Sequence, residues 1–206
     1  KQHKFWPKSA YLSLAPHVVE PDLLGGTQFF DALTEDARLV QRLIQESLQL
    51  GGQALNYAQV SALNINEKNS QLSVVLEGQD QALIIDSKVV VNACGAWSNL
   101  LQVNHDKQSD SHKKSSVNMR PLRGSHLVIA NWRLPVASVI SVQHSQDKRP
   151  VQIYPWQNVT IVGTTDVDHN DDMSFEAKIS QLEFDYLLAA VEQQFPNAKI
   201  TKDDII

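Results

Sequence analysis

A polar run near the middle of the chain divides it into two parts with different patterns. Residues Asn104 to Ser116 consist of Lys, Asp, Ser, His and other polar residues, with almost nothing apolar. Such a run has no apolar face to bury, and it is therefore typical of a linker. We assign residues 105–116 to a polar linker, and we expect folded parts at 34–104 and 117–206.

The part before the linker begins with a helix that leads into strands. Apolar residues recur at three- and four-residue spacing from Glu35 to Leu50, which predicts an amphipathic helix. We expect Thr34 to cap its first turn and the glycine pair at 51–52 to end it. The strands predicted to follow are 54–60, 61–66 and 71–77, the last two in a small antiparallel meander.

A valine-rich segment follows the meander. Lys88 to Ala93 contains three consecutive valines, as expected for a strand that is buried on both faces. The small residues from Cys94 to Trp97 come next and would let a ligand approach the backbone closely. An ordinary tight turn after a core strand is an equally good interpretation. We interpret Cys94 as a small buried hydrophobic residue.

The part after the linker has the pattern of an antiparallel sheet with one helix. The helix is expected at 181–195, where Ser180 and Glu183 form a capping box and Pro196 ends the helix. Turn residues separate four strand-like segments. These predicted strands are 125–130, 137–142, 151–154 and 159–162. The fold class is therefore mixed α/β (α+β).

Composition excludes several classes of protein and site. The 206 residues carry a formal net charge of -5, so the chain lacks the basic surface of a nucleic-acid binder. One cysteine cannot form an intramolecular disulfide, and no apolar run reaches the roughly 20 residues of a membrane-spanning helix. We expect a soluble, cytoplasmic protein. His105, Asp106, Asp110 and His112 have some metal-ligand character, but we assign them to the solvated linker and expect no metal site.

Two segments after the linker carry side chains suited to catalysis. In the first, 120–129, His126 stands at a strand start, where a neutral imidazole could act as a general base. The arginines at 120 and 123 could bind a phosphate or carboxylate. In the second, 159–168, two threonines and an aspartate at 164–166 place hydroxyls and a carboxylate at a strand end. A structural histidine and a capped turn are the alternative interpretations.

In combination and in this order, the motifs of the chain resemble one family of flavoproteins. The motifs are Asn92 to Trp97, Arg120 to His126, Ile153 to Trp156, Gly163 to Val167 and Lys202 to Ile205. They resemble the FAD-dependent, respiratory glycerol-3-phosphate dehydrogenases of the D-amino-acid-oxidase-like superfamily, over nearly the whole chain. The resemblance implies part of a doubly wound FAD-binding domain at 34–104 and an antiparallel-sheet substrate-binding (cap) domain at 117–206. We expect residues 1–33 to form an edge of the substrate-binding domain.

The resemblance also implies an activity. Members of this family oxidise sn-glycerol 3-phosphate to dihydroxyacetone phosphate by hydride transfer to FAD, and a membrane quinone then takes the electrons. The implied active-site residues are His126, Thr165 and Asp166, with His126, Arg123 and Arg149 as candidates for binding the substrate. The residues implied in FAD binding are Val60, Ala93, Cys94, Gly95 and Trp97. Peripheral association with the inner face of the cell membrane is a further implication.

The chain departs from the family pattern at three places. No Gly-x-Gly-x-x-Gly motif is present, so the glycine-rich turn that binds the FAD pyrophosphate in this family is missing from the sequence. The strand that carries the family's substrate arginine would follow Ile206, and Cys94 replaces a common threonine. Residues 1–9 also lack a helix or strand pattern. We therefore expect a piece of a longer polypeptide, which by itself neither retains FAD nor turns over substrate.

Two other functions fit the sequence. A related FAD-dependent oxidase of the same superfamily would act on an amine such as glycine or sarcosine and consume oxygen. A non-catalytic binding domain would use these residues for recognition alone, and replacing His126 would then leave turnover unchanged.

Overall fold

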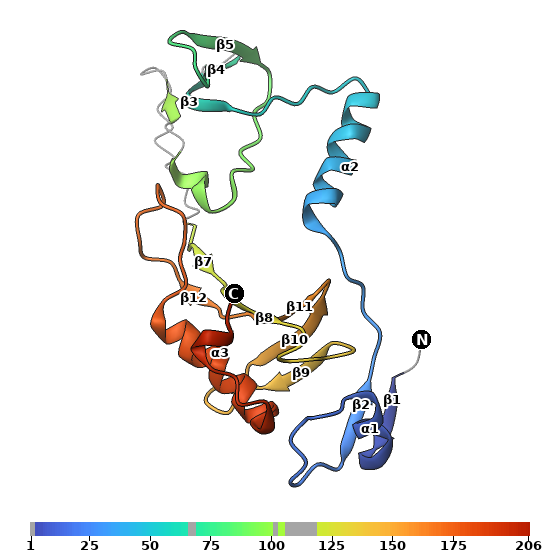
Figure 1. Cartoon of the computed structure of the whole chain (residues 1–206). Helices are drawn as coiled ribbons and strands as arrows, with labels where there is room; N and C mark the ends of the chain where they lie inside the picture. The colour runs from blue at the N-terminus through green and yellow to red at the C-terminus, as the bar shows by residue number, and fades with distance from the viewer. Residues whose placement is uncertain (1–2, 66–68, 101–102, 106–118) are drawn as a thin grey trace. The chain divides into compact units, whose positions relative to one another are not determined.

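The computed structural model describes residues 3–65, 69–100, 103–105 and 119–206, which form two compact units (Figure 1). Unit 1 comprises Lys1–Asp31 together with Pro121–Ile206, and unit 2 comprises Ala32–Arg120. The predicted linker lies, from residue 106 onward, outside the described residues. Both units contain helices and strands, which confirms the mixed fold class.

A four-stranded antiparallel sheet forms the centre of unit 1, as the pattern after residue 117 predicts. Its strands lie in the order β8 (His126–Ala130), β11 (Val159–Gly163), β10 (Pro150–Trp156) and β9 (Ile140–Gln143). β9 begins later than predicted because residues 137–138 form a bend. In the register of β8 with β11, Leu127 pairs with Val162, so their side chains share one face of the sheet. Both are at most 2% exposed, which identifies this face as the buried one.

Helix α3 (Gln181–Gln194) packs on the buried face of this sheet (Figure 1). Ser180 and Glu183 form the predicted capping box at its first turn. Leu187, Ala190 and Val191 of the helix are completely buried and belong to the same hydrophobic core as the sheet residues. The removal of these apolar side chains from water stabilises the packing of helix on sheet.

Residues 1–33 contain elements that their sequence pattern does not predict. β1 (Lys4–Pro7) and β2 (Gly25–Gln28) pair antiparallel, with α1 (Lys8–Leu14) between them in the chain. In the part of the chain that the structure describes, these strands pair with each other and add no edge to the larger sheet. Ala15 and Val18 instead join the core of unit 1. A strand of four residues is too short to show a clear alternation in the sequence.

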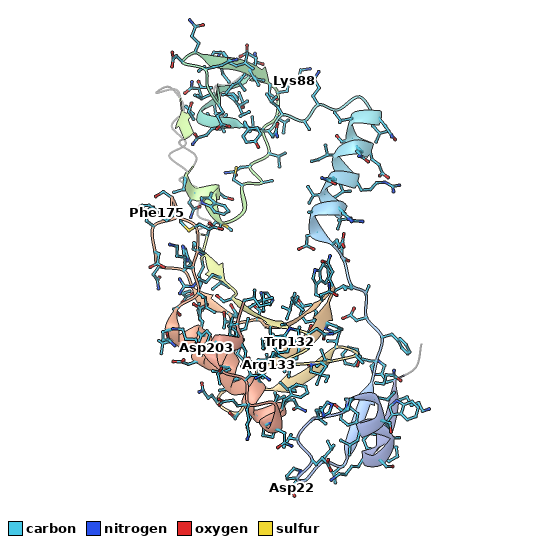
Figure 2. The ribbon with its side chains drawn as sticks, viewed as in Figure 1. Asp22, Lys88, Trp132, Arg133, Phe175 and Asp203 are labelled. Carbon is cyan, nitrogen blue, oxygen red and sulfur yellow. The ribbon has the colours of Figure 1, made fainter. Side chains whose placement is uncertain are left out.

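The C-terminal residues lie along the edge of the sheet beside β8. Ile205 pairs antiparallel with Ile129. The 3-10 turn η3 (Lys202–Asp204) precedes this pair, and Figure 2 labels its Asp203 and the nearby Arg133. Arg133 Nη2 donates a hydrogen bond of 2.9 Å to Asp204 Oδ2. This ion pair ties the C-terminal segment to the turn that follows β8.

Unit 2 contains helix α2 (Asp36–Gln49), a 3-10 turn η1 (Gly95–Leu100) and a second four-stranded sheet. The strands lie in the order β5 (Ala82–Ser87), β4 (Ser70–Leu76), β3 (Ala58–Ile65) and β6 (Val103–His105). β6 is parallel to β3, and the other pairs are antiparallel. The predicted strands 54–60 and 61–66 are one strand, β3, with a register shift between Val60 and Ala62.

Two predictions about the helices and strands of unit 2 are wrong. Residues 88–93 form no strand among the described residues, and Val89 and Val91 are 74% and 81% exposed. A strand that is buried on both faces needs neighbours, and none of the described strands pairs with this segment. At α2 the N-cap residue is Glu35, and no side chain there accepts a capping hydrogen bond, so Thr34 does not cap the helix.

The predicted apolar face of α2 is largely uncovered in the described structure. Its residues are between 41 and 58% exposed: Leu39, Val40, Leu43, Ile44 and Leu48. The helix is therefore amphipathic as predicted, but the described residues supply little that packs on it. Among the described helices, none combines the length and apolar character needed to cross a bilayer.

Replacing a core leucine of α3 should destabilise unit 1. We expect Leu187→Ala to lower its free energy of unfolding by about 2–5 kcal/mol, because the substitution leaves a cavity. Leu182 lies on the same helix and is 83% exposed, so Leu182→Ala should change this free energy by less than about 0.5 kcal/mol. Native-state hydrogen exchange of core amides in the full-length protein measures both changes. Equal effects of the two substitutions would contradict this packing.

Candidate active site

Strand pairing brings the two predicted catalytic segments of unit 1 side by side. His126 at the start of β8 pairs with Gly163 at the end of β11. Just beyond these residues, the short strands β7 (Leu122–Arg123) and β12 (Val167–Asp168) also pair. The segments 121–126 and 163–168 therefore run antiparallel to each other, although they lie far apart in the sequence. None of the sequence patterns predicts this pairing.

Two glycines allow the segments to approach closely. A Cβ on Gly163 would come within 2.3 Å of Cδ2 of the His126 ring. A Cβ on Gly124 would come within 2.4 Å of Thr164 Oγ1 and 2.9 Å of the Thr165 carbonyl oxygen. Because real Cβ atoms do not approach other atoms this closely, a side chain at either position would push the segments apart. The His126 ring therefore lies where only glycine fits on the adjacent strand.

His126 lies at the surface of unit 1, but the surrounding protein lowers the pKa of its imidazole. Burial of part of the imidazole lowers the pKa of His126 from its ordinary value of 6.5. The imidazole therefore stays neutral to a lower pH than a fully solvated histidine does. A neutral imidazole can accept a proton, as a general base must.

Behind the paired segments, a buried carboxylate binds both of them. Glu183 of α3 is 3% exposed, and its Oε1 accepts hydrogen bonds from Ser125 Oγ (2.8 Å) and Thr165 Oγ1 (2.9 Å). Thr165 Oγ1 in turn accepts a hydrogen bond from Ser125 N (2.8 Å), and Thr165 N donates to Ser125 O (3.2 Å). One side chain of the helix thus bridges the residue before His126 and the residue before Asp166.

The second oxygen of this carboxylate, Glu183 Oε2, accepts hydrogen bonds from Arg123 and Ser180. Arg123 donates to Glu183 Oε2 from Nε (3.1 Å) and Nη2 (3.0 Å), and Ser180 donates to it from N (3.0 Å) and Oγ (2.7 Å). Burial alone would raise the pKa of Glu183, but hydrogen bonds from Ser180, Arg123 and Ser125 outweigh it and lower the pKa to about 2. Glu183 is therefore ionised at neutral pH.

A pocket of about 390 Å³ opens beside these segments. Its lining residues are Leu122, Arg123, Gly124, Arg149, Pro150, Thr164, Thr165 and Asp166. Arg149 immediately precedes β10. Its Nη1 donates to Asp166 O (3.1 Å), while Nη2 forms an ion pair with the Asp166 carboxylate. The two side chains are 45% and 47% exposed, so solvent and ligands can reach this pair.

The two arginines of the pocket differ in how readily a ligand could bind their guanidinium groups. The Arg123 side chain is 17% exposed and is bound to Glu183 and to Asp171 Oδ2 (3.0 Å). An exposed ion pair such as that of Arg149 with Asp166 contributes little to stability, and an incoming anion can replace its carboxylate. Arg149 is therefore the arginine better suited to binding a ligand, whereas the guanidinium of Arg123 is already occupied by protein carboxylates.

The five residues implied in cofactor binding all lie in unit 2. Val60 is on β3 at the register shift, next to a second pocket of about 390 Å³. The residues that line this pocket are Tyr57, Ala58, Gln59, Val75 and Glu77. Val60 itself is not one of them, and it pairs with Val74 of β4.

The segment from Ala93 to Trp97 is an exposed turn. Asn92 Oδ1 accepts a hydrogen bond from Cys94 N (3.2 Å), and Ser98 Oγ donates to Gly95 O (2.6 Å). Gly95 has a φ of 54°, and a Cβ placed there would meet nothing within 4 Å. Cys94 is exposed, so its interpretation as a buried hydrophobic residue is wrong. The open backbone at Gly95 fits the close approach of an extended cofactor.

The sequence did not reveal Glu183 as part of the site. Its position in a capping box is visible in the sequence, but capping explains only its bonds to Ser180. The bonds to Ser125 and Thr165 depend on how α3 packs on the sheet.

Among the described residues, no group of three His, Cys, Asp or Glu side chains could hold a metal ion.

Comparison with known proteins identifies relatives over the whole chain. Residues 1–205 match the family described as DAO, FAD dependent oxidoreductase. The alpha-glycerophosphate oxidase of Streptococcus pyogenes is 32% identical over 98% of this chain, which corresponds to 33% of that protein. The chain thus spans about a third of the length of the curated relatives it matches.

Solved structures support the same relationship. The glycerol-3-phosphate dehydrogenase from Bacillus halodurans, complexed with FAD, matches with a TM-score of 0.82 and 27% identity over 98% of this chain and 39% of that one. The glycine oxidase from Geobacillus kaustophilus matches with a TM-score of 0.65 over 97% of this chain and 48% of that one. At 16% identity, the second match indicates the fold alone.

Replacing Gly163 should displace the His126 ring. We expect Gly163→Ala to raise the pKa of His126 toward 6.5, because a displaced imidazole becomes more solvated and its charged form is no longer disfavoured. NMR titration of His126 in the full-length protein measures the shift. Gly78→Ala is the control for local strain outside unit 1: a Cβ there meets nothing within 4 Å, but its φ of 77° disfavours alanine. An unchanged pKa of His126 in Gly163→Ala would contradict the close contact.

Proposed function

The chain belongs to the FAD-dependent oxidoreductase family, and from this premise we propose that it is part of an enzyme that oxidises sn-glycerol 3-phosphate to dihydroxyacetone phosphate. Its similarity to an alpha-glycerophosphate oxidase and a glycerol-3-phosphate dehydrogenase supports this substrate. The observation that carries the proposal is the pocket of unit 1, where the exposed Arg149 lies among segments that also position His126.

Arg149 binds the phosphate group in this proposal. A dianionic phosphate replaces the Asp166 carboxylate on the guanidinium, because a bidentate charge-assisted pair with phosphate is stronger than an exposed ion pair. Arg123 is a less suitable phosphate ligand, since Glu183 and Asp171 already neutralise it. Its role is to hold Glu183 in its ionised form.

His126 removes the proton in this proposal. Oxidation of the alcohol transfers a hydride from the carbinol carbon, and FAD, when bound, is the acceptor of that hydride. The hydroxyl proton must leave at the same stage, and the neutral imidazole of His126 accepts it. Thr165 and Asp166 support the site, the first by fixing the backbone beside His126 and the second by orienting Arg149 until the substrate binds.

The cofactor is held by residues of unit 2 in this proposal. The backbone of β3 at Val60 would meet the adenine, and the turn that contains Ala93, Cys94, Gly95 and Trp97 would line FAD. The exposure of this turn and the space at Gly95 support the assignment. A membrane quinone takes up the electrons, and the full-length protein acts in the cytoplasm or at the inner face of the cell membrane.

The full-length protein should oxidise glycerol 3-phosphate. We expect it to reduce a quinone-like dye with glycerol 3-phosphate and to show no oxygen consumption with glycine or sarcosine. His126→Ala should lower kcat by about a hundredfold to ten-thousandfold, as expected for loss of a general base. His3→Ala removes an exposed imidazole of unit 1 outside the pocket and should leave kcat unchanged. Activity with amines instead of glycerol 3-phosphate would overturn the proposal, and full activity of His126→Ala would favour a binding role.

Removal of the Arg149 charge should weaken substrate binding. We expect Arg149→Gln to raise KM for glycerol 3-phosphate about tenfold to a hundredfold, as expected for loss of a charge-assisted hydrogen bond. Lys148→Gln is the matched control, because it removes a positive charge from the adjacent position outside the pocket lining. Steady-state kinetics of both variants measure the difference. Equal KM values for the two variants would place the phosphate elsewhere.

A further inference from the structure

Glu183 accepts more hydrogen bonds than a helix cap requires. A capping box needs only the reciprocal bonds between Ser180 and Glu183. The Glu183 carboxylate also accepts from Arg123, Ser125 and Thr165, which belong to the two segments that form the pocket. A carboxylate that joins three separate parts of the chain restrains all of them at once.

The position of these bonds matters for the reacting groups. Ser125 immediately precedes His126, and Thr165 immediately precedes Asp166, the partner of Arg149. Both hydroxyls bind the same oxygen, Glu183 Oε1, so neither segment can shift without breaking a hydrogen bond that is buried (Thr165) or partly buried (Ser125). Each such loss leaves an unsatisfied polar group away from water and is therefore unfavourable.

We propose that Glu183 is a positioning residue, which holds His126 and the Arg149–Asp166 pair in the geometry needed for oxidation of the substrate. Glu183 touches neither substrate nor cofactor in this inference, and it acts through Ser125 and Thr165. The inference rests on the proposed function for its kinetic test, but the restraint itself can be measured without substrate.

Another carboxylate of unit 1 provides a matched control. Asp204 also forms a capping box, with Thr201 at η3, and it also binds an arginine, Arg133. Asp204 lines neither described pocket. Glu183→Gln and Asp204→Asn therefore remove the same kinds of bond, one beside the pocket and one outside its lining.

The experiment compares the two variants in the full-length protein with FAD. We expect Glu183→Gln to lower kcat for glycerol 3-phosphate about tenfold to a hundredfold, because misplacement of reacting groups has effects of this size. KM should change less than about threefold, since Arg149 keeps its charge. Asp204→Asn should lower the melting temperature by a similar amount and leave kcat unchanged. A kcat for Glu183→Gln that equals that of Asp204→Asn would overturn the inference.

Hydrogen exchange separates this inference from the proposed function. We expect Glu183→Gln, and not Asp204→Asn, to speed exchange in peptides that cover 121–128 and 163–168. Failure of the wild-type protein to oxidise glycerol 3-phosphate would refute the proposed function, and the exchange rates would still decide the role of Glu183. Unchanged exchange would refute positioning. If Glu183→Gln does not fold, Ser125→Ala replaces it, and an unchanged kcat in that variant would overturn the inference.

Discussion

A buried negative charge organises the pocket of unit 1. Glu183 lies at the first turn of α3 with 3% of its surface exposed, and an unpaired carboxylate in such a place is strongly unfavourable. Arg123 from β7, Ser125 before β8 and Thr165 after β11 supply the compensating hydrogen bonds. Stabilisation of the charge therefore requires the helix and the two segments 121–126 and 163–168 to meet at one point.

The two arginines of the pocket differ in their partners and in their exposure. Arg123 is bound to Glu183 and Asp171, so its charge is used within the protein. Arg149 shares an exposed ion pair with Asp166, and such a pair can exchange its carboxylate for another anion. The neutral His126 on the adjacent strand, beside Gly163, adds a proton acceptor. The proposed function assigns Arg149 to the anionic group of the substrate and His126 to its hydroxyl proton.

Unit 2 exposes apolar residues that the sequence pattern predicts to be buried. The apolar face of α2 and the valines at 89 and 91 are exposed, although their sequence pattern is that of buried segments. The chain spans about a third of the length of its curated relatives. The exposed turn at Gly95 belongs to the same unit, so the residues assigned to the cofactor lie among surfaces that the described residues leave uncovered.

Sequence patterns by themselves determined the mixed fold class, the helices α2 and α3, the Ser180–Glu183 cap and the four strands β8 to β11, whose ends they gave to within a few residues. These elements arise from periodicity and capping, which are local properties. Motif resemblance also identified the family. Only the tertiary structure placed His126 against Gly163, assigned Arg123 to Glu183 and left Arg149 accessible. It also showed that no described strand pairs with residues 88–93. Those features depend on contacts between residues far apart in the chain, and no local pattern records which distant groups will meet.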